Sequence, residues 1–128
     1  MFTGLIEALG EVAAVSPVPA GLRIRVRTGL TAELELGDSI AVNGVCLTVT
    51  QLDKNYFSAD VSQETLNCTT FSQLKKGQNI NLEKSLRLNQ GVDGHIVSGH
   101  VDGVGKITLI AIEGDSTRMK IKVDDNLV

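Results

Sequence analysis

Aromatic side chains are scarce in this sequence. Its 128 residues include three phenylalanines, one tyrosine and no tryptophan. Proteins that bind single-stranded nucleic acids stack the bases on aromatic side chains along a basic groove. Here 12 Lys and Arg residues are scattered among 15 Asp and Glu residues, with a formal net charge of −3. The composition therefore argues against nucleic-acid binding.

Cysteines and long apolar runs are also few. Cys46 and Cys68 have no CxxC spacing, and the opening MFTGLIEALG lacks the basic flank and apolar run of a signal peptide. No apolar stretch approaches the roughly 18 residues that a membrane span needs. We expect a soluble, cytoplasmic protein with reduced thiols that forms a core without a metal or disulfides.

Alternating residues predict a strand over residues 22–27. Leu22, Ile24 and Val26 alternate with three arginines, which is the period-two pattern of a strand with one buried face and a basic outer face. Further along, Ser62 followed by Gln63-Glu64 predicts the N-cap and first turn of a short helix.

A hairpin is predicted within residues 40–50, IAVNGVCLTVT. Asn43-Gly44 stands between two apolar runs, and both residues tolerate the positive φ of a type I′ turn. On the strand that follows, Cys46 shares one face with Thr48 and Thr50. These polar companions favour a pocket wall around Cys46, although a lone thiol is also common as a small buried apolar residue.

The most informative feature is an internal repeat. TGLIEALGEV at 3–12 aligns without gaps on SGHVDGVGKI at 98–107, and residues 22–26 align on 119–123. One unit therefore spans about 97 residues.

This repeat divides the chain into a first domain at residues 1–97 and the first two strands of a second, incomplete domain at 98–128. A partial barrel exposes unpaired strand edges, which pair with other chains unless they are covered. We therefore expect either a shortened protein or an oligomer that covers the edge.

Five segments, in order, resemble the signature segments of the riboflavin synthase family. They are MFTGLIE at the start, GDSIAVNGVCLTVT at 37–50, DVSQETL at 60–66, LKKGQNINLEKSLRL at 74–88 and DGHIVSGHVDGVG at 93–105. The resemblance covers the whole chain. The family also shows an internal duplication.

The resemblance implies an all-β fold of two six-stranded antiparallel Greek-key barrels, generally assembled as a trimer. The implied reaction transfers a four-carbon unit between two molecules of 6,7-dimethyl-8-ribityllumazine. It yields riboflavin and 5-amino-6-ribitylaminouracil, the last step of riboflavin biosynthesis, and needs no metal or redox cofactor. Implied partners are these small molecules, further copies of the chain (a trimer, or a dimer for the shortened form) and lumazine synthase.

The resemblance also implies which residues contact the ligand in the first barrel. They match Gly4-Leu5-Ile6, Cys46-Leu47-Thr48 and Asp60-Val61-Ser62-Gln63-Glu64-Thr65. Gly4 would allow close approach to a flat ring, and the polar side chains of the third segment could bind the ribityl hydroxyls. The alternative is that Gly4 permits a bulge and Ser62 caps a helix.

The resemblance places Cys46 near the reacting ring, as a nucleophile or proton relay, and leaves Cys68 structural or incidental. It assigns Gly99-His100-Val101 to the second pocket, where His100 aligns with Leu5 of the first repeat. An imidazole there could take a proton from the lumazine methyl group. The alternative is a hydrogen-bonded surface histidine.

Other classes of function compete with this one. A metal site formed by His95, His100, Asp93 and Asp102 is not expected, because a separation of five puts the two histidines on opposite faces of a strand. The competing functions are a non-catalytic lumazine- or flavin-binding protein and a generic barrel used for protein interaction.

Overall fold

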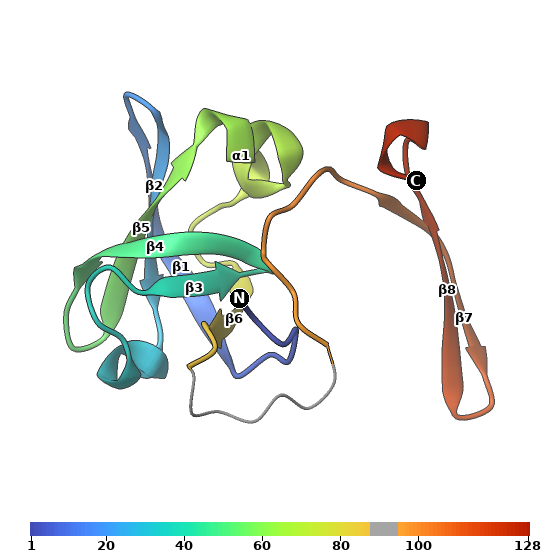
Figure 1. The fold of residues 1–128 in the computed structure, drawn as a ribbon, viewed down its shortest axis with the longest axis horizontal. Helices are drawn as coiled ribbons and strands as arrows, with labels where there is room; N and C mark the ends of the chain where they lie inside the picture. The colour runs from blue at the N-terminus through green and yellow to red at the C-terminus, as the bar shows by residue number, and fades with distance from the viewer. Residues whose placement is uncertain (88–94) are drawn as a thin grey trace.

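The computed structural model describes residues 1–87 and 95–128 and contains a closed barrel joined to a separate hairpin (Figure 1). The strands are β1 (Ala8–Val18), β2 (Gly21–Arg27), β3 (Ser39–Val42), β4 (Val45–Leu52), β5 (Tyr56–Ser62), β6 (Asn79–Lys84), β7 (Lys106–Glu113) and β8 (Ser116–Lys122). The helical segments are α1 (Gln63–Cys68) and the 3₁₀ turns Gly29–Glu33, Phe71–Gln73 and Asp125–Leu127.

The barrel closes in the order β1-β2-β5-β4-β3-β6, with every neighbouring pair antiparallel. This crossed order is a Greek key, because β2 pairs with β5 rather than with β3. The predicted all-β fold with a six-stranded Greek-key barrel is therefore confirmed. Closure leaves no free edge on the first barrel.

The strand pattern predicted from the sequence is confirmed. Ile24 and Val26 are fully buried, whereas the arginines that alternate with them, at 23, 25 and 27, are exposed. On β4 the predicted faces also separate, since Val45, Leu47 and Val49 are buried and Thr48 and Thr50 are exposed. On these two strands alternate residues thus point into the barrel, as in a half-buried sheet.

Both local signals also hold. Asn43 and Gly44 have φ values of 47° and 81°, so the predicted type I′ hairpin joins β3 to β4. Ser62 caps α1, because its side chain accepts a hydrogen bond from the Thr65 N–H at 3.2 Å. Within the described part of the chain, no helix is long and apolar enough to cross a membrane.

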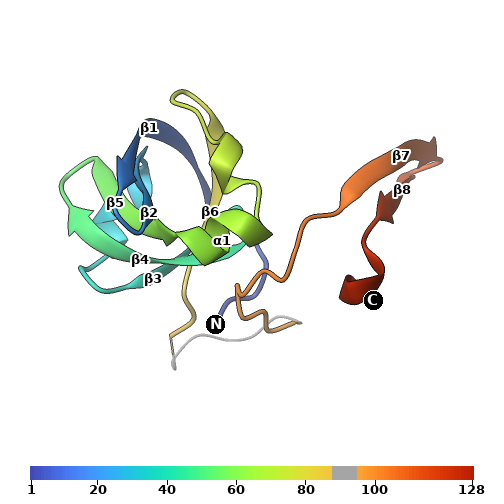
Figure 2. The same ribbon diagram turned by 90° about the horizontal axis from the view of Figure 1, so that it is seen from above.

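The hairpin β7–β8 repeats the first two strands of the barrel. β1 has a bulge between Val12 and Ala14, and β7 has one between Ile107 and Leu109, the positions that align in the repeat. The two hairpins differ in burial: Val12 is fully buried, whereas Ile107 is 51% exposed. Figures 1 and 2 both show why, since β7–β8 extends away from the barrel.

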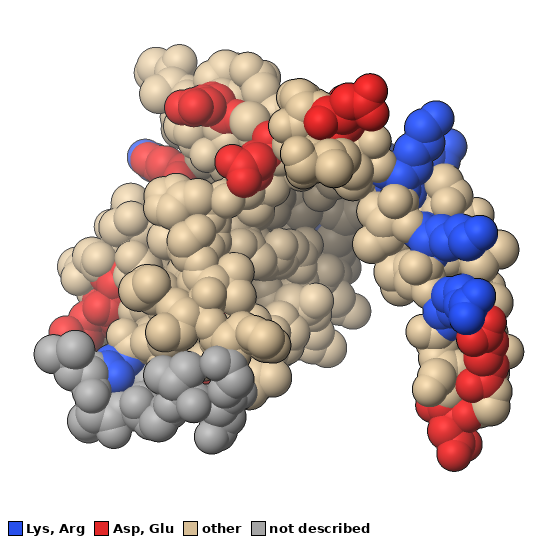
Figure 3. Space-filling view, turned by 45° about the vertical axis from the view of Figure 1, so that its right-hand side comes forward, with Lys and Arg blue, Asp and Glu red and all other residues tan. Residues whose placement is uncertain are grey.

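Charges on the two hairpins are also arranged alike. In β2, Arg23 and Arg25 form ion pairs with Asp60 and Asp53. On the second hairpin, Figure 3 shows basic side chains in a row along its length. The hairpin residues of this kind are Lys106, Arg118, Lys120 and Lys122.

Candidate functional site

The N-terminal arm, residues 1–7, and the crossover segment, residues 95–105, run side by side along the barrel. Phe2 and Val97 form an antiparallel bridge between them. Figures 1 and 2 show that the crossover segment then passes by α1 before it reaches the hairpin. The starts of the two sequence repeats therefore cross each other.

The crossover segment docks on the first residues of β4 through Gly99. Its carbonyl accepts a hydrogen bond from the Cys46 N–H at 3.0 Å. Gly99 has a φ of +82°, and a Cβ atom there would lie 2.8 Å from the Cys46 Cβ and 3.0 Å from the Phe2 ring. Glycine is required here both by the left-handed backbone and by the close approach.

This docking forms one wall of a pocket of about 300 Å³, which we call the Cys46 pocket. Its walls come from the start of β4, from α1 with the residue that follows it, and from the crossover segment. The lining residues are Val45, Cys46, Glu64, Thr65, Cys68, Thr69, Gly99, His100, Val101 and Asp102.

Six of the residues that the sequence assigned to the ligand site lie together in this pocket. They are Cys46, Glu64, Thr65, Gly99, His100 and Val101. The pocket thus combines a thiol, an imidazole, carboxylates and hydroxyls. Such a mixed set can bind a polyhydroxyl chain and can move a proton.

His100 is exposed, and its backbone N–H donates to Ser98 Oγ at 3.2 Å. The equivalent bond in the first repeat runs from the Leu5 N–H to Thr3 Oγ1 at 3.1 Å. The two repeat starts therefore share one local conformation but carry different side chains. His100 and Leu5 therefore occupy equivalent backbone positions, although one side chain is an imidazole and the other is apolar.

The structure divides the predicted site residues differently from the expectation. His100, which was assigned to the second pocket, lines the same pocket as Cys46. The segment Gly4-Leu5-Ile6, which was assigned to the first pocket, is not among its lining residues and is exposed, with Leu5 at 59%. The crossing of the two repeat starts brings the second one against the first barrel, and the ligand contacts predicted for both segments stay predictions.

The remaining predicted residues lie outside the lining set. Leu47 and Val61 are buried in the core, and Thr48 is exposed on β4. Asp60 is ion-paired with Arg23 at 2.8 Å on the outer face. The hydrogen bond from Arg23 lowers the pKa of the Asp60 carboxyl below its usual value.

Ser62 and Gln63 act locally in α1. Ser62 supplies the cap, and the Gln63 side chain donates to Asn67 Oδ1 at 3.0 Å. The cap that the sequence predicted is thus present, while the ligand contact predicted for Ser62 stays a prediction.

Sequence reasoning missed four lining residues: Val45, Cys68, Thr69 and Asp102. A helical spacing could have found two of them, because residues four apart lie on one face of a helix. Glu64 and Thr65 predict Cys68 and Thr69 by this rule. Val45 and Asp102 carry no such local signal.

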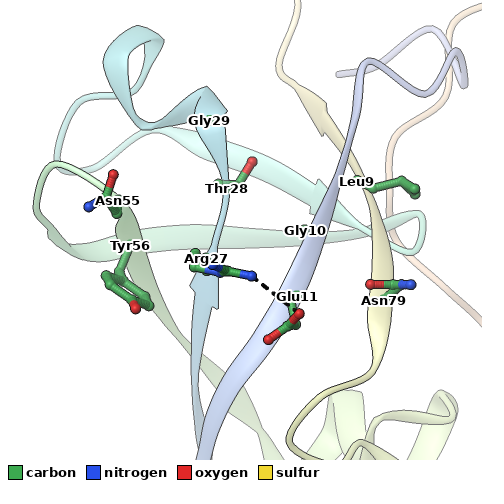
Figure 4. Close-up of a pocket in the computed structure, with 9 residues that line it drawn as sticks. All are labelled: Leu9, Gly10, Glu11, Arg27, Thr28, Gly29, Asn55, Tyr56 and Asn79. Carbon is green, nitrogen blue, oxygen red and sulfur yellow. Dashed lines mark hydrogen bonds and ion pairs between the residues drawn. The ribbon is translucent and has the colours of Figure 1, made fainter.

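A larger hollow of about 570 Å³ lies elsewhere on the barrel. Figure 4 shows its residues, which are Leu9, Gly10, Glu11, Arg27, Thr28, Gly29, Asn55, Tyr56 and Asn79. Arg27 and Glu11 form an ion pair across it at 3.4 Å. It contains no residue of the predicted site. It also lacks a thiol and an imidazole, and the crossover segment does not line it. We therefore take the smaller pocket as the candidate site.

Among residues 1–87 and 95–128, no group of three or more His, Cys, Asp and Glu side chains is arranged to hold a metal ion. Asp93, one of the four residues weighed for a metal site, lies outside the described residues.

The fold and pocket define a class: a Greek-key barrel whose candidate pocket is walled on one side by the start of a second, repeated unit. Residues 3–85 match the family model described as lumazine binding domain. The chain belongs to this family, and the resemblance found in the sequence is confirmed.

Relatives of known name support the same assignment. The chain is 40% identical to riboflavin synthase of Bacillus subtilis (strain 168) and 43% identical to that of Actinobacillus pleuropneumoniae, with 99% and 100% of this chain aligned. In both alignments the chain spans 60% of the relative's length.

Solved structures of LumP are similar in fold. LumP complexed with 6,7-dimethyl-8-(1′-D-ribityl) lumazine superposes with a TM-score of 0.85 at 25% identity, over 98% of this chain and 71% of that one. LumP complexed with riboflavin gives a TM-score of 0.86 at 25% identity, over 100% and 70% of the two chains.

Proposed function

We propose that the Cys46 pocket binds 6,7-dimethyl-8-ribityllumazine and that the chain functions as a riboflavin synthase. The observation that carries this proposal is the docking of the crossover segment, which puts the imidazole of His100 in one pocket with the thiol of Cys46. The names of the relatives and the ligands bound to the LumP structures support the choice of substrate.

The proposed reaction uses two identical substrates in unequal roles. A methyl group of one lumazine loses a proton and becomes a carbon nucleophile that attacks the other. His100 accepts and returns that proton, and Cys46 adds to the ring or relays a proton beside it. Together the two lumazines contain all atoms of riboflavin and 5-amino-6-ribitylaminouracil, so no external oxidant or reductant takes part.

The second substrate requires a second pocket. Gly4, Leu5 and Ile6 are the repeat equivalents of Gly99, His100 and Val101, and they are exposed. We propose that they line the repeat-related pocket, whose remaining walls correspond to a part of the relatives' length that this chain does not span. Leu5 in place of an imidazole would make that pocket unequal to the first, as donor and acceptor roles require.

The larger setting of the proposal follows from the family. We propose a homo-oligomer, with a trimer favoured by the family and a dimer as the alternative, because the apolar side chains of β7–β8 are exposed. Lumazine synthase as a partner and a cytoplasmic location stay predictions.

A direct experiment mixes the chain with 6,7-dimethyl-8-ribityllumazine and follows both ligand fluorescence and riboflavin formation. Wild type should quench the fluorescence on binding, and Cys46→Ala should reduce turnover more than binding. Thr50→Ala is the matched control, since Thr50 lies on the same strand face but outside the pocket.

The outcomes separate the candidate functions. Binding with riboflavin formation supports the enzyme, and binding without it supports the alternative of a non-catalytic lumazine- or flavin-binding protein. No binding at ligand concentrations that saturate a relative would overturn both.

A further inference from the structure

Glu83 on β6 has a buried carboxylate that does not line the pocket. Its residue is 5% exposed, although β6 is a barrel strand with Leu82 facing the core beside it. Acidic residues are almost never fully buried unless their oxygens are paired. The burial of Glu83 therefore requires partners, and the structure provides them from the N-terminal arm.

Three donors of the arm converge on this carboxylate. The Thr3 N–H and the Thr3 hydroxyl donate to Oε2 at 2.7 and 2.8 Å, and the Gly4 N–H donates to Oε1 at 3.0 Å. The partners are about 80 residues apart in sequence. Hydrogen bonds to a carboxylate are stronger than those between neutral groups, so this cluster is the main polar anchor at the centre of the arm.

Further contacts fix the arm along the same strand end. The Leu86 N–H donates to the Met1 carbonyl at 2.9 Å, and the Glu7 N–H donates to the Leu82 carbonyl at 2.9 Å. The Glu83 carboxylate binds Thr3 and Gly4, the two residues that follow Phe2. The arm is therefore held on one side by β6 and on its other side carries the crossover segment.

The path from Glu83 to the pocket is continuous. Thr3 follows Phe2, whose backbone bridges Val97 and whose ring is in contact distance of Gly99. Gly99 in turn accepts the hydrogen bond from the Cys46 N–H. Displacement of the arm would remove the surface on which the crossover segment lies, and with it the wall that contains His100.

We propose that Glu83 is a positioning residue for the Cys46 pocket, acting through the N-terminal arm on Gly99 and His100. The ligand-binding part of this statement rests on the proposed function. The positioning part concerns the protein alone and can be tested without any ligand.

The test is amide hydrogen exchange by NMR on the full chain, wild type against Glu83→Gln. An amide oxygen can replace only one side of the carboxylate, and its NH₂ group faces a donor. The Cys46 and Val97 amides should exchange about tenfold faster, because unsatisfied buried donors weaken the arm. The Val49 amide, which lies in the same strand as Cys46 and donates to the Asp38 carbonyl, should not change.

Matched variants separate positioning from simple loss of charge or fold. Glu33→Gln removes an exposed carboxylate that pairs with Lys84 and should leave the Cys46 amide unaffected. Thr3→Val removes one of the three donors, whereas Thr3→Ser retains it and should restore wild-type exchange. If Glu83→Gln does not fold, the two Thr3 variants carry the test.

Two results would overturn the proposal. Unchanged exchange at Cys46 would mean that the crossover segment is held without Glu83. Equal acceleration at Cys46 and Val49 would mean that Glu83 stabilises the barrel as a whole and positions nothing in particular.

A lumazine titration then links the arm to binding. Glu83→Gln should weaken affinity about fivefold to tenfold if the pocket wall moves. Should wild type itself fail to bind, the proposed function falls, while the exchange result still decides the positioning role.

Discussion

Phe2 and Val97 exchange both of their backbone hydrogen bonds, with N–O distances of 2.7 Å from Phe2 and 2.6 Å from Val97. Each residue stands one position before the start of a sequence repeat. The two repeats therefore meet at their first residues in an antiparallel pair, and each continues past the other. This single bridge explains why His100 reaches the first barrel.

Phe2 should be sensitive to truncation although it lies outside the barrel strands. It is 2% exposed, and a Cβ atom added at Gly99 would lie 3.0 Å from its ring. We expect Phe2→Ala to lower the free energy of unfolding by about 3–5 kcal/mol, the usual range for removal of a buried aromatic ring. Chemical denaturation measures this, with Leu9→Ala as a control because Leu9 is 63% exposed. A loss below 1 kcal/mol would contradict the packing described.

Gly99→Ala should disrupt the pocket beyond ordinary backbone strain. Gly37→Ala is the control, because Gly37 also has a positive φ, +88°, but a Cβ atom there meets nothing within 4 Å. In both variants the free energy of unfolding should fall by about 1–2 kcal/mol, because alanine is strained in the left-handed backbone conformation. In Gly99→Ala it should fall further, because the Cβ atom would clash with Cys46. Lumazine fluorescence should report weaker binding for Gly99→Ala alone. Equal affinities would argue that the crossover segment forms no part of the binding wall.

His100→Ala should weaken ligand binding in the pocket that contains Cys46. The sequence alone led to the opposite expectation, because it placed His100 in the other pocket. Leu5→Ala, at the equivalent position of the first repeat, should leave this affinity unchanged, since Leu5 does not line the pocket. Equilibrium fluorescence titration of the two variants decides the matter, and a loss with Leu5→Ala but not with His100→Ala would restore the original assignment.

The Asp60 carboxylate should stabilise the folded protein at neutral pH but not at acidic pH. Arg23 lowers the pKa of Asp60 in the folded state below the unfolded value of about 3.9. The resulting stabilisation is therefore complete at neutral pH and is lost as the pH falls through the folded pKa. Asp60→Asn should be slightly less stable than wild type at pH 7 and equally stable near pH ~2. The effect should be small because both side chains are more than 40% exposed. Denaturation at the two pH values measures it, and a constant difference would contradict the ion pair as its source.

The local elements could be predicted because their signals lie within a few residues. Asn43-Gly44 determines a turn by its φ values, and Ser62 determines a helix start by its cap. The alternation around Ile24 gives a strand and its buried face. The internal repeat also predicted the second hairpin, including its first strand, β7.

The arrangement of the pocket could not be predicted in the same way. Glu83 looks like an ordinary charged residue of a strand, and its three donors are about 80 residues away in sequence. The docking of Gly99 on Cys46 likewise joins segments that share no local pattern. Periodicity indicates which face of a strand is buried, but it contains no information on which distant segment covers the open end of a barrel.

The crossing has a consequence for any attempt to dissect the protein. Residues 1–87 contain every strand of the closed barrel, yet Gly99, His100 and Val101 belong to the pocket. A boundary at residue 97, as the repeat suggests, would therefore yield a piece that includes every strand of the barrel but lacks one wall of the candidate pocket. In this protein the stretch of chain that forms the closed barrel is not the whole stretch that lines the candidate pocket.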